Sequence, residues 1–206
     1  AVGGASLWRM KESRSAETLA QAMLESPFGA YMALLKQRRL IGYCLAGALN
    51  GATLFTYISA SPELLMGTYG ATPTQFPWLF GLNAAAVIGS SQINRYALRR
   101  ATPDEVLSRA SLASVVAGAL LALAAVTGIG GPWTVLPMLF ILLGTYGFMQ
   151  GNTMAGALNV DTRRAGSVSA LMGGASFGVG ALASGLTGVL HDGTARPMAL
   201  TMFLAL

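Results

Sequence analysis

Long apolar stretches without strongly charged side chains dominate the chain. No Asp, Glu, Lys, Arg or His lies in residues 40–62, 64–94, 110–160 or 165–190. One membrane crossing takes roughly 17 to 25 residues, at about 1.5 Å rise per residue and about 30 Å of hydrocarbon. The stretches therefore predict membrane-spanning helices, and the longer ones must contain a break.

Glycine and proline positions show where the longer stretches break. Gly67, Gly70, Pro73 and Pro77 shorten the second stretch, and the Gly-rich segment 128–132 interrupts the third. The pattern predicts an all-α integral membrane bundle with five whole spans and an incomplete sixth. The expected spans are about 40–61, 77–94, 107–128, 133–157, 166–190 and 197–206.

Basic residues gather in the connections on one side of this predicted bundle. They are Lys36, Arg38, Arg39, Arg95, Arg99, Arg100, Arg109, Arg163 and Arg164. The opposite connections contain only Arg196. Because cytoplasmic loops carry the excess of Lys and Arg, this arrangement predicts a multi-pass protein whose chain starts in the cytoplasm.

Residues 1–39 precede the first complete span. Residues 1–8 are expected to end a preceding helix, and the rest form a charged cytoplasmic loop. Ser26 as N-cap and Pro27 at the first helical position predict a short amphipathic helix that continues to residue 39. Its apolar face is expected to hold Phe28, Tyr31, Met32 and Leu35. This helix rests either on the membrane surface or on the next span, or it is a solvated linker.

The chain is expected to be part of a longer polypeptide. No initiator Met opens it, and the last apolar segment, 197–206, has half the length that a membrane helix needs. The expected division is a loop region over 1–39 and a transmembrane bundle over 40–206.

Composition narrows the possible functions. Hydrophobic residues make up 53% of the chain and charged residues 10%, against roughly 25% charged in soluble domains. The net charge of +5 is spread between the apolar stretches, which favours membrane orientation and gives no sign of nucleic-acid binding. One Cys and one His leave no residues for an ordinary metal site or a disulfide framework.

The expected spans hold no acid or base in their cores. No proton carrier and no catalytic dyad is therefore expected in this segment, which argues against an intramembrane enzyme. Cys44 is expected to be a small buried apolar residue. His191 and Asp192 are expected to form a turn at the outer membrane surface, with a titrating pair as the alternative.

Polar residues recur at helical spacing in three of the spans, accompanied by Ser90, Asn94 and Thr153. The residues expected to line a substrate cavity are Asn50, Thr53, Tyr57, Asn83, Tyr146 and Gln150. With nearby aromatic groups, such a cavity suits a drug-like ligand. The alternative is that each polar side chain bonds a neighbouring helix and serves only structure.

Small residues are spaced for close contact between helices, and the fifth span is especially rich in glycine. Such spacing lets helix backbones approach in a bilayer, or lets a helix slide or bend. The predicted packing or hinge positions are Gly47, Gly51, Gly147, Gly151, Gly174 and Gly178.

Several segments in order resemble one transporter family. Residues 57–62, 69–76 and 80–84 resemble the seventh-to-eighth helix region of the Bcr/CflA drug-resistance transporters of the major facilitator superfamily. Segments 152–158 and 165–173 resemble that family's tenth-to-eleventh helix signature. Two earlier segments resemble its central loop and the part after its sixth helix, namely 28–43 and 10–19.

The resemblance implies a twelve-helix multidrug exporter of the bacterial inner membrane, driven by the proton gradient without another cofactor. This chain would be its carboxy-terminal, major-facilitator-type six-helix half with the last helix truncated. Its partners would be a small drug-like substrate, the lipid bilayer and the amino-terminal half, which holds the family's proton-binding acids. Arg95, Arg99 and Arg100 would form a degenerate copy of a cytoplasmic loop signature. They serve either as gate anchors or as plain topology determinants.

Two other functions stay open at the level of sequence. A transporter of a small polar metabolite fits Asn50, Asn83 and Gln150 equally well. A non-transporting membrane scaffold is favoured if the polar faces are wholly used in contacts between helices.

Overall fold

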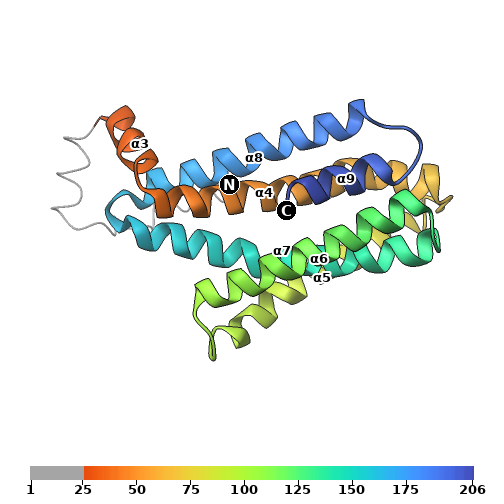
Figure 1. Ribbon diagram of the computed structural model, residues 1–206, viewed down its shortest axis with the longest axis horizontal. Helices are drawn as coiled ribbons and strands as arrows, with labels where there is room; N and C mark the ends of the chain where they lie inside the picture. The colour runs from red at the N-terminus through yellow and green to blue at the C-terminus, as the bar shows by residue number, and fades with distance from the viewer. Residues whose placement is uncertain (1–25) are drawn as a thin grey trace, which may run out of the picture.

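The computed structural model describes residues 26–206, and every regular element within them is a helix (Figure 1). The expectations for residues 1–25 lie outside the described residues. The long helices are α4 (Arg38–Pro62), α5 (Phe76–Ala97), α6 (Pro103–Thr127), α7 (Pro132–Val160) and α8 (Ala165–Val189). The short elements are α3 (Pro27–Leu35), the π-helix η1 (Glu63–Thr68), the 3-10 helix η2 (Thr162–Arg164) and α9 (Arg196–Leu204). The all-α prediction is confirmed.

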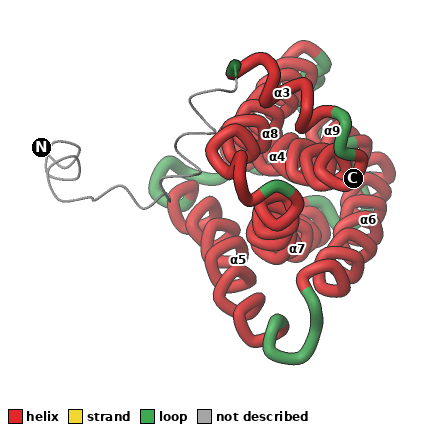
Figure 2. The backbone as a smooth tube through the Cα atoms, turned by 90° about the vertical axis from the view of Figure 1, so that its left-hand side faces the viewer, coloured by secondary structure: helices red, strands yellow, loops and turns green. Residues whose placement is uncertain are grey.

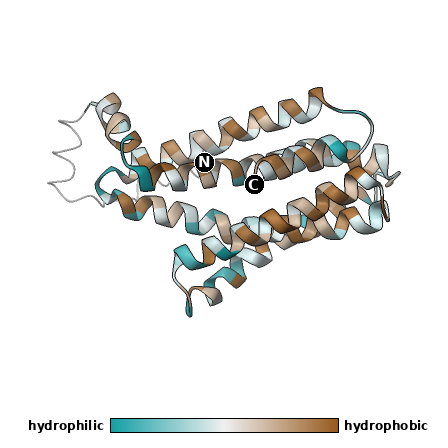
Figure 3. Cartoon of the chain, viewed as in Figure 1, coloured by the Kyte–Doolittle hydropathy of each residue, from teal (hydrophilic) through white to brown (hydrophobic). Residues whose placement is uncertain are grey.

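Four helical segments in the described part are long and apolar enough to cross a membrane. They are Arg38–Thr68, Pro103–Thr127, Pro132–Val160 and Thr162–Val189. Helix α5, the expected second span, is not among them, because polar residues such as Asn83, Ser90 and Asn94 interrupt its apolar sequence. Helix α9 has only nine residues. Figure 3 shows apolar residues along the helices and strongly hydrophilic ones mostly near helix ends.

Helix α3 differs from the helix expected over residues 28–39. Ser26 Oγ caps it by accepting from the Gly29 amide at 3.0 Å, but it ends at Leu35. The chain turns at residues 36 and 37, and Arg38 already begins α4. The expected apolar face is largely exposed at Phe28, Met32 and Leu35, whereas Ala30 and Leu34 are buried.

The breaks between spans have clear local causes. Helix α6 starts with a capping box, in which the Glu105 amide donates to Thr102 Oγ1 and the Thr102 amide donates to Glu105 Oε2. It ends at Gly128, whose φ of 70° is the left-handed conformation that glycine adopts without strain.

Helix α7 occupies the middle of the bundle, where it contacts α4, α5 and α6 (Figure 2). Helix α8 lies along α4, and the two run side by side in Figure 1. Helix α9 packs on α6 and α4. Helix α8 is covered mainly on its α4 side, and only 17% of its most apolar window is buried.

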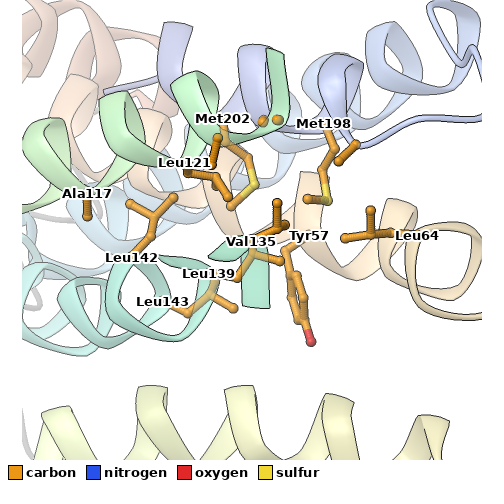
Figure 4. Close-up of a cluster of buried hydrophobic side chains, with 14 residues drawn as sticks. Tyr57, Leu64, Ala117, Leu121, Val135, Leu139, Leu142, Leu143, Met198 and Met202 are labelled. Atoms are coloured by element: carbon orange, nitrogen blue, oxygen red, sulfur yellow. The ribbon is translucent and has the colours of Figure 1, made fainter. Parts of the chain in front are cut away.

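Two apolar clusters hold the helices together. The larger joins α4, η1, α6, α7 and α9, and Figure 4 shows its side chains interlocking around Leu121, Leu139, Met198 and Met202. The smaller joins α3, α4, α7 and α8. Its buried members are Leu34, Leu40, Tyr43, Cys44, Ala157, Val168 and Met172. Cys44 is thus a buried apolar residue, without a disulfide partner.

Candidate functional site

The polar residues predicted on α4 face the interior of the bundle. Asn50, Thr53 and Tyr57 are each only 2% exposed. Thr53 Oγ1 donates to the Leu49 carbonyl at 3.3 Å, within its own helix. Asn50 Nδ2 is buried and has no hydrogen-bond partner.

Asn83 connects the α4 row to α5. Its Nδ2 donates to Tyr57 Oη at 3.0 Å, and this bond is buried. The Tyr57 ring stacks on Phe80 with 5.5 Å between ring centroids. Asn83 Oδ1 points to no partner although it is buried. The pair therefore fixes Tyr57 while it leaves one carbonyl oxygen unused.

Tyr146 and Gln150 on α7 are half-buried. The structure forms no hydrogen bond between either side chain and the α4 or α5 row within residues 26–206. Gln150 Oε1 is nevertheless buried without a partner. Three of the six predicted side chains, Asn50, Asn83 and Gln150, thus bury a polar atom without a partner, and Thr56 Oγ1 on α4 is a fourth such atom.

Unpartnered polar atoms are rare inside folded proteins, because burying one without a hydrogen bond costs about 1–3 kcal/mol. A bilayer offers no water to relieve that cost. Asn50, Asn83 and Gln150 each bury one polar atom without a partner, a donor on Asn50 and an acceptor on each of the other two. The arrangement is therefore suited to hydrogen bonding with a polar ligand or a missing segment.

Two hollows lie in the described part of the chain, and none of the six predicted residues lines either of them. One hollow, of about 720 Å³, lies between α5, α6 and α7. The other, of about 270 Å³, lies where the ends of α4 and α8 meet η1 and α9. The polar row is packed between helices here, so the expected open cavity is not formed at these residues.

Close backbone contacts explain this tight packing. A side chain at Gly147 would collide with the Val87 carbonyl and Ser90 of α5, and one at Gly51 with Ser176 of α8. A Cβ at Gly47 would lie 3.0 Å from Met172 Cε. Gly151 has more room, since its Cβ would lie 3.7 Å from Asn94 Nδ2.

Gly174 and Gly178 behave differently from the other predicted packing glycines. A Cβ at either position would meet nothing within 4 Å. They do not serve helix packing within residues 26–206, because α8 is covered mainly by α4. Some glycines outside the predicted set do make close contacts, such as Gly156 with the Tyr43 ring and Gly180 with the Phe55 ring.

A second amide pair was not among the predicted site residues. Asn152 Nδ2 on α7 donates to Asn94 Oδ1 on α5 at 3.0 Å, and both residues are buried. Asn152 Nδ2 also lies 2.8 Å from the Phe148 carbonyl, which accepts from it. Asn94 stands out in the polar spacing of its span, but nothing in the sequence pairs it with Asn152.

The three predicted gate arginines lie at the α5–α6 connection. Arg95 Nη1 donates to Gln92 Oε1 at 3.4 Å, and the Arg99 guanidinium lies 4.9 Å from the centre of the Tyr96 ring. Arg100 borders the larger hollow. None of the three forms an ion pair with an acidic residue in the described part.

Hydrogen bonds of Asp161 with Arg164 and Gln37, called the clamp below, connect segments at the same end of the bundle. Asp161 Oδ2 accepts from Arg164 Nη1 at 2.8 Å and from Gln37 Nε2 at 3.0 Å. Burial alone would raise the pKa of Asp161, but the hydrogen bonds from Arg164 and Gln37 hold it below its usual value. Nearby, Arg39 pairs with Asp104 at 2.8 Å on an exposed surface.

The opposite end holds the predicted His191–Asp192 turn. Asp192 Oδ1 accepts from the Thr194 amide at 2.9 Å, and the hydrogen bonds with Thr194 lower the pKa of Asp192. His191 Nε2 lies 3.7 Å from Glu63 Oε1 of η1. His191 therefore faces Glu63. The described residues contain no cluster of three His, Cys, Asp or Glu side chains that would hold a metal.

Long apolar helices with polar side chains buried between them define a multi-pass helical membrane protein. The chain is 33% identical over 199 residues to the uncharacterized MFS-type transporter YdgK of Bacillus subtilis, covering 95% of this chain and 48% of that protein. It is 28% identical over 172 residues to a bicyclomycin resistance protein homolog of Haemophilus influenzae, covering 84% of this chain and 43% of that protein.

These relatives confirm the resemblance found in the sequence, and the chain belongs to the major facilitator superfamily of transporters. The chain spans about half the length of the curated relatives it matches. No protein-family model and no solved structure matches it.

Proposed function

We propose that this chain is the carboxy-terminal half of an exporter that moves drugs or similar small molecules out of a bacterium in exchange for protons. It works by alternating access against an amino-terminal half, and it carries out no chemical reaction. The relatives support transport and efflux, because one is an MFS-type transporter and the other a bicyclomycin resistance homologue.

The proposed sidedness follows from charge. The basic connections, which include the clamp at Asp161 and the arginines after α5, face the cytoplasm by the positive-inside rule. The proposed location is the inner membrane. The proton gradient supplies the energy, and the proton-carrying acids belong to the amino-terminal half, since the apolar stretches of this chain contain no acid.

The observation that carries the proposal is the set of unused polar atoms on Asn50, Asn83 and Gln150. A purely structural role would pair each of these atoms with a neighbouring helix. In the proposed cycle, the helices separate enough to let substrate reach these atoms, and they close again after release. The tight contacts at Gly51 and Gly147 describe the closed arrangement of this half.

The test is a resistance and efflux assay of the full-length protein in cells exposed to phenicols, sulfonamides and bicyclomycin. Asn83→Leu and Gln150→Leu remove the unused polar atoms and are expected to change the range of exported compounds. Leu82→Ala is the matched control, since Leu82 neighbours Asn83 on α5 but is exposed. Unchanged resistance in both variants would show that these residues do not meet substrate.

Transport of a small polar metabolite is the second candidate, and the amide-rich row favours it. Amides offer both donors and acceptors, which suits a polar solute at least as well as an apolar drug. A substrate panel that contains small polar metabolites separates the two. The unused atoms count against a scaffold that only holds helices together.

A further inference from the structure

A groove of about 720 Å³ runs between α5, α6 and α7. Its walls are small or apolar, and they include Ala86, Gly89, Ile93, Ala113, Phe140 and Gly144. Two arginines, Arg100 and Arg109, line it near the α5–α6 connection. None of the six residues predicted to meet substrate lies in this groove.

The groove exists because α5 and α6 both pack on α7 but diverge from each other. Helices α5 and α6 both pack on α7 but scarcely touch each other. Figure 2 shows them on either side of α7, joined by their connecting loop. Glycine and alanine leave the space between them unfilled. A Cβ added at Gly89 or Gly144 would meet nothing within 4 Å.

The charges at the end of the groove are available to a ligand. Neither the Arg100 nor the Arg109 side chain forms an ion pair or hydrogen bond within residues 26–206. The acids nearby are already engaged, since Glu105 accepts from the Thr102 amide and Asp104 pairs with Arg39. Glu105 lies close enough to Arg109 to interact through charge alone.

We propose that this groove binds one anionic phospholipid, with an acyl chain along the apolar walls and the phosphate between Arg100 and Arg109. The positive-inside rule puts these arginines at the cytoplasmic surface, where anionic lipids give the membrane its negative potential. The planar guanidinium suits phosphate oxygens geometrically. Apolar walls and a positive end match the two parts of such a lipid.

The first experiment measures lipid binding to the purified full-length protein by native mass spectrometry. Phosphatidylglycerol and phosphatidylcholine with the same acyl chains are added in parallel. Phosphatidylglycerol is expected to bind more tightly. Arg100→Gln and Arg109→Gln are each expected to weaken its binding about fivefold, whereas Arg99→Gln changes nothing, because Arg99 stacks on Tyr96 outside the groove. Equal binding of both lipids, or equal loss in all three variants, would overturn the proposal.

The second experiment fills the groove without touching its charges. Gly89→Leu and Gly144→Leu place side chains in the open space and are expected to reduce phosphatidylglycerol binding severalfold. Gly81→Leu on α5 is the control, since Gly81 also has open space around it but does not line the groove. Lipid binding that persists in both filled variants would place the lipid elsewhere and overturn the proposal. The arginine variants, at exposed positions, supply the same test if a filled variant does not fold.

Discussion

Helix α5 has two faces with opposite polarity, one buried against other helices and one along the open groove. One face turns Asn83 and Asn94 inward, where they bond to Tyr57 and Asn152. The other carries Gly89 and Ile93 along the apolar groove. In a bilayer, lipid chains cannot satisfy polar groups, so amides gain by turning toward other helices. The inward polarity of α5 therefore fits a helix in a membrane, although its overall sequence is less apolar than its neighbours.

Helix α7 also has one face packed against α5 and another face along the groove. Gly147 and Asn152 lie against α5, whereas Ile141 and Gly144 line the groove. The face toward α5 is close-packed and hydrogen-bonded, whereas the face along the groove is open and apolar. The difference separates positions that determine the fold from positions that are free to accept a ligand.

The largest expected effect tests these two faces of α7 directly. Gly147→Leu drives a side chain into the backbone of α5 and is expected to lower the yield of folded protein strongly, since overpacking costs about 1–3 kcal/mol and the backbone cannot move aside as a flexible side chain would. Gly144→Leu, one turn away, is expected to leave the folded yield unchanged. Size-exclusion profiles of the two purified variants check this. Equal yields would contradict the assigned faces.

A buried polar contact between the membrane-spanning segments, at Asp161, sharpens the comparison. Asp161→Asn is expected to lower the free energy of unfolding by about 1.5–3 kcal/mol at neutral pH, because it weakens charge-assisted bonds from Arg164 and Gln37. The pKa of Asp161 is lowered on folding. Its contribution is therefore present above about pH 4 and lost as the pH falls through the folded-state pKa.

The check is the melting temperature of both proteins between neutral pH and pH 3. The advantage of the natural protein over Asp161→Asn is expected to shrink at the acid end. A constant difference would show that the carboxylate charge does not matter to the clamp.

The buried amide pair is expected to have a smaller effect. Asn152→Leu leaves Asn94 Oδ1 without its donor, at a cost of about 0.6–1.7 kcal/mol, the range of hydrogen bonds between helices in membranes. The double variant with Asn94→Leu is expected to recover part of that loss. A thermodynamic cycle over the single and double variants gives the coupling energy, and a value of zero would mean that the two amides do not interact.

The smallest effect is expected on the groove side. Ile93→Ala removes an exposed apolar side chain that packs on no neighbouring helix core, so stability is expected to change by less than about 0.5 kcal/mol. A thermal unfolding curve beside that of Asn152→Leu makes the comparison. A larger loss at Ile93 than at Asn152 would reverse the roles of the two faces.

Local sequence signals predict much of the bundle. The charge-free stretches mark the long helices, and Gly128 marks the end of α6. The expected start of that span at residue 107 is four residues late, because the capping box of Thr102 and Glu105 begins the helix at Pro103. The end of α3 was placed too late, because Arg38 and Arg39 continue helically into α4 and the turn at residue 36 carries no glycine or proline.

Contacts between distant residues were beyond reach of the sequence. Helical spacing showed that Asn94 is turned to one side, yet only the packing of α5 on α7 reveals Asn152 as its partner. Spacing likewise suggested Gly174 and Gly178 for packing, but a regular interval does not say whether another helix covers that face. The groove arises from the divergence of α5 and α6, which no local pattern records.

The most direct test of the proposed function is efflux by the full-length protein from energised cells, with and without an uncoupler that collapses the proton gradient. The account predicts that the protein lowers accumulation of at least one compound of the drug panel and that the uncoupler restores it. Accumulation that the uncoupler leaves unchanged would contradict proton-driven export.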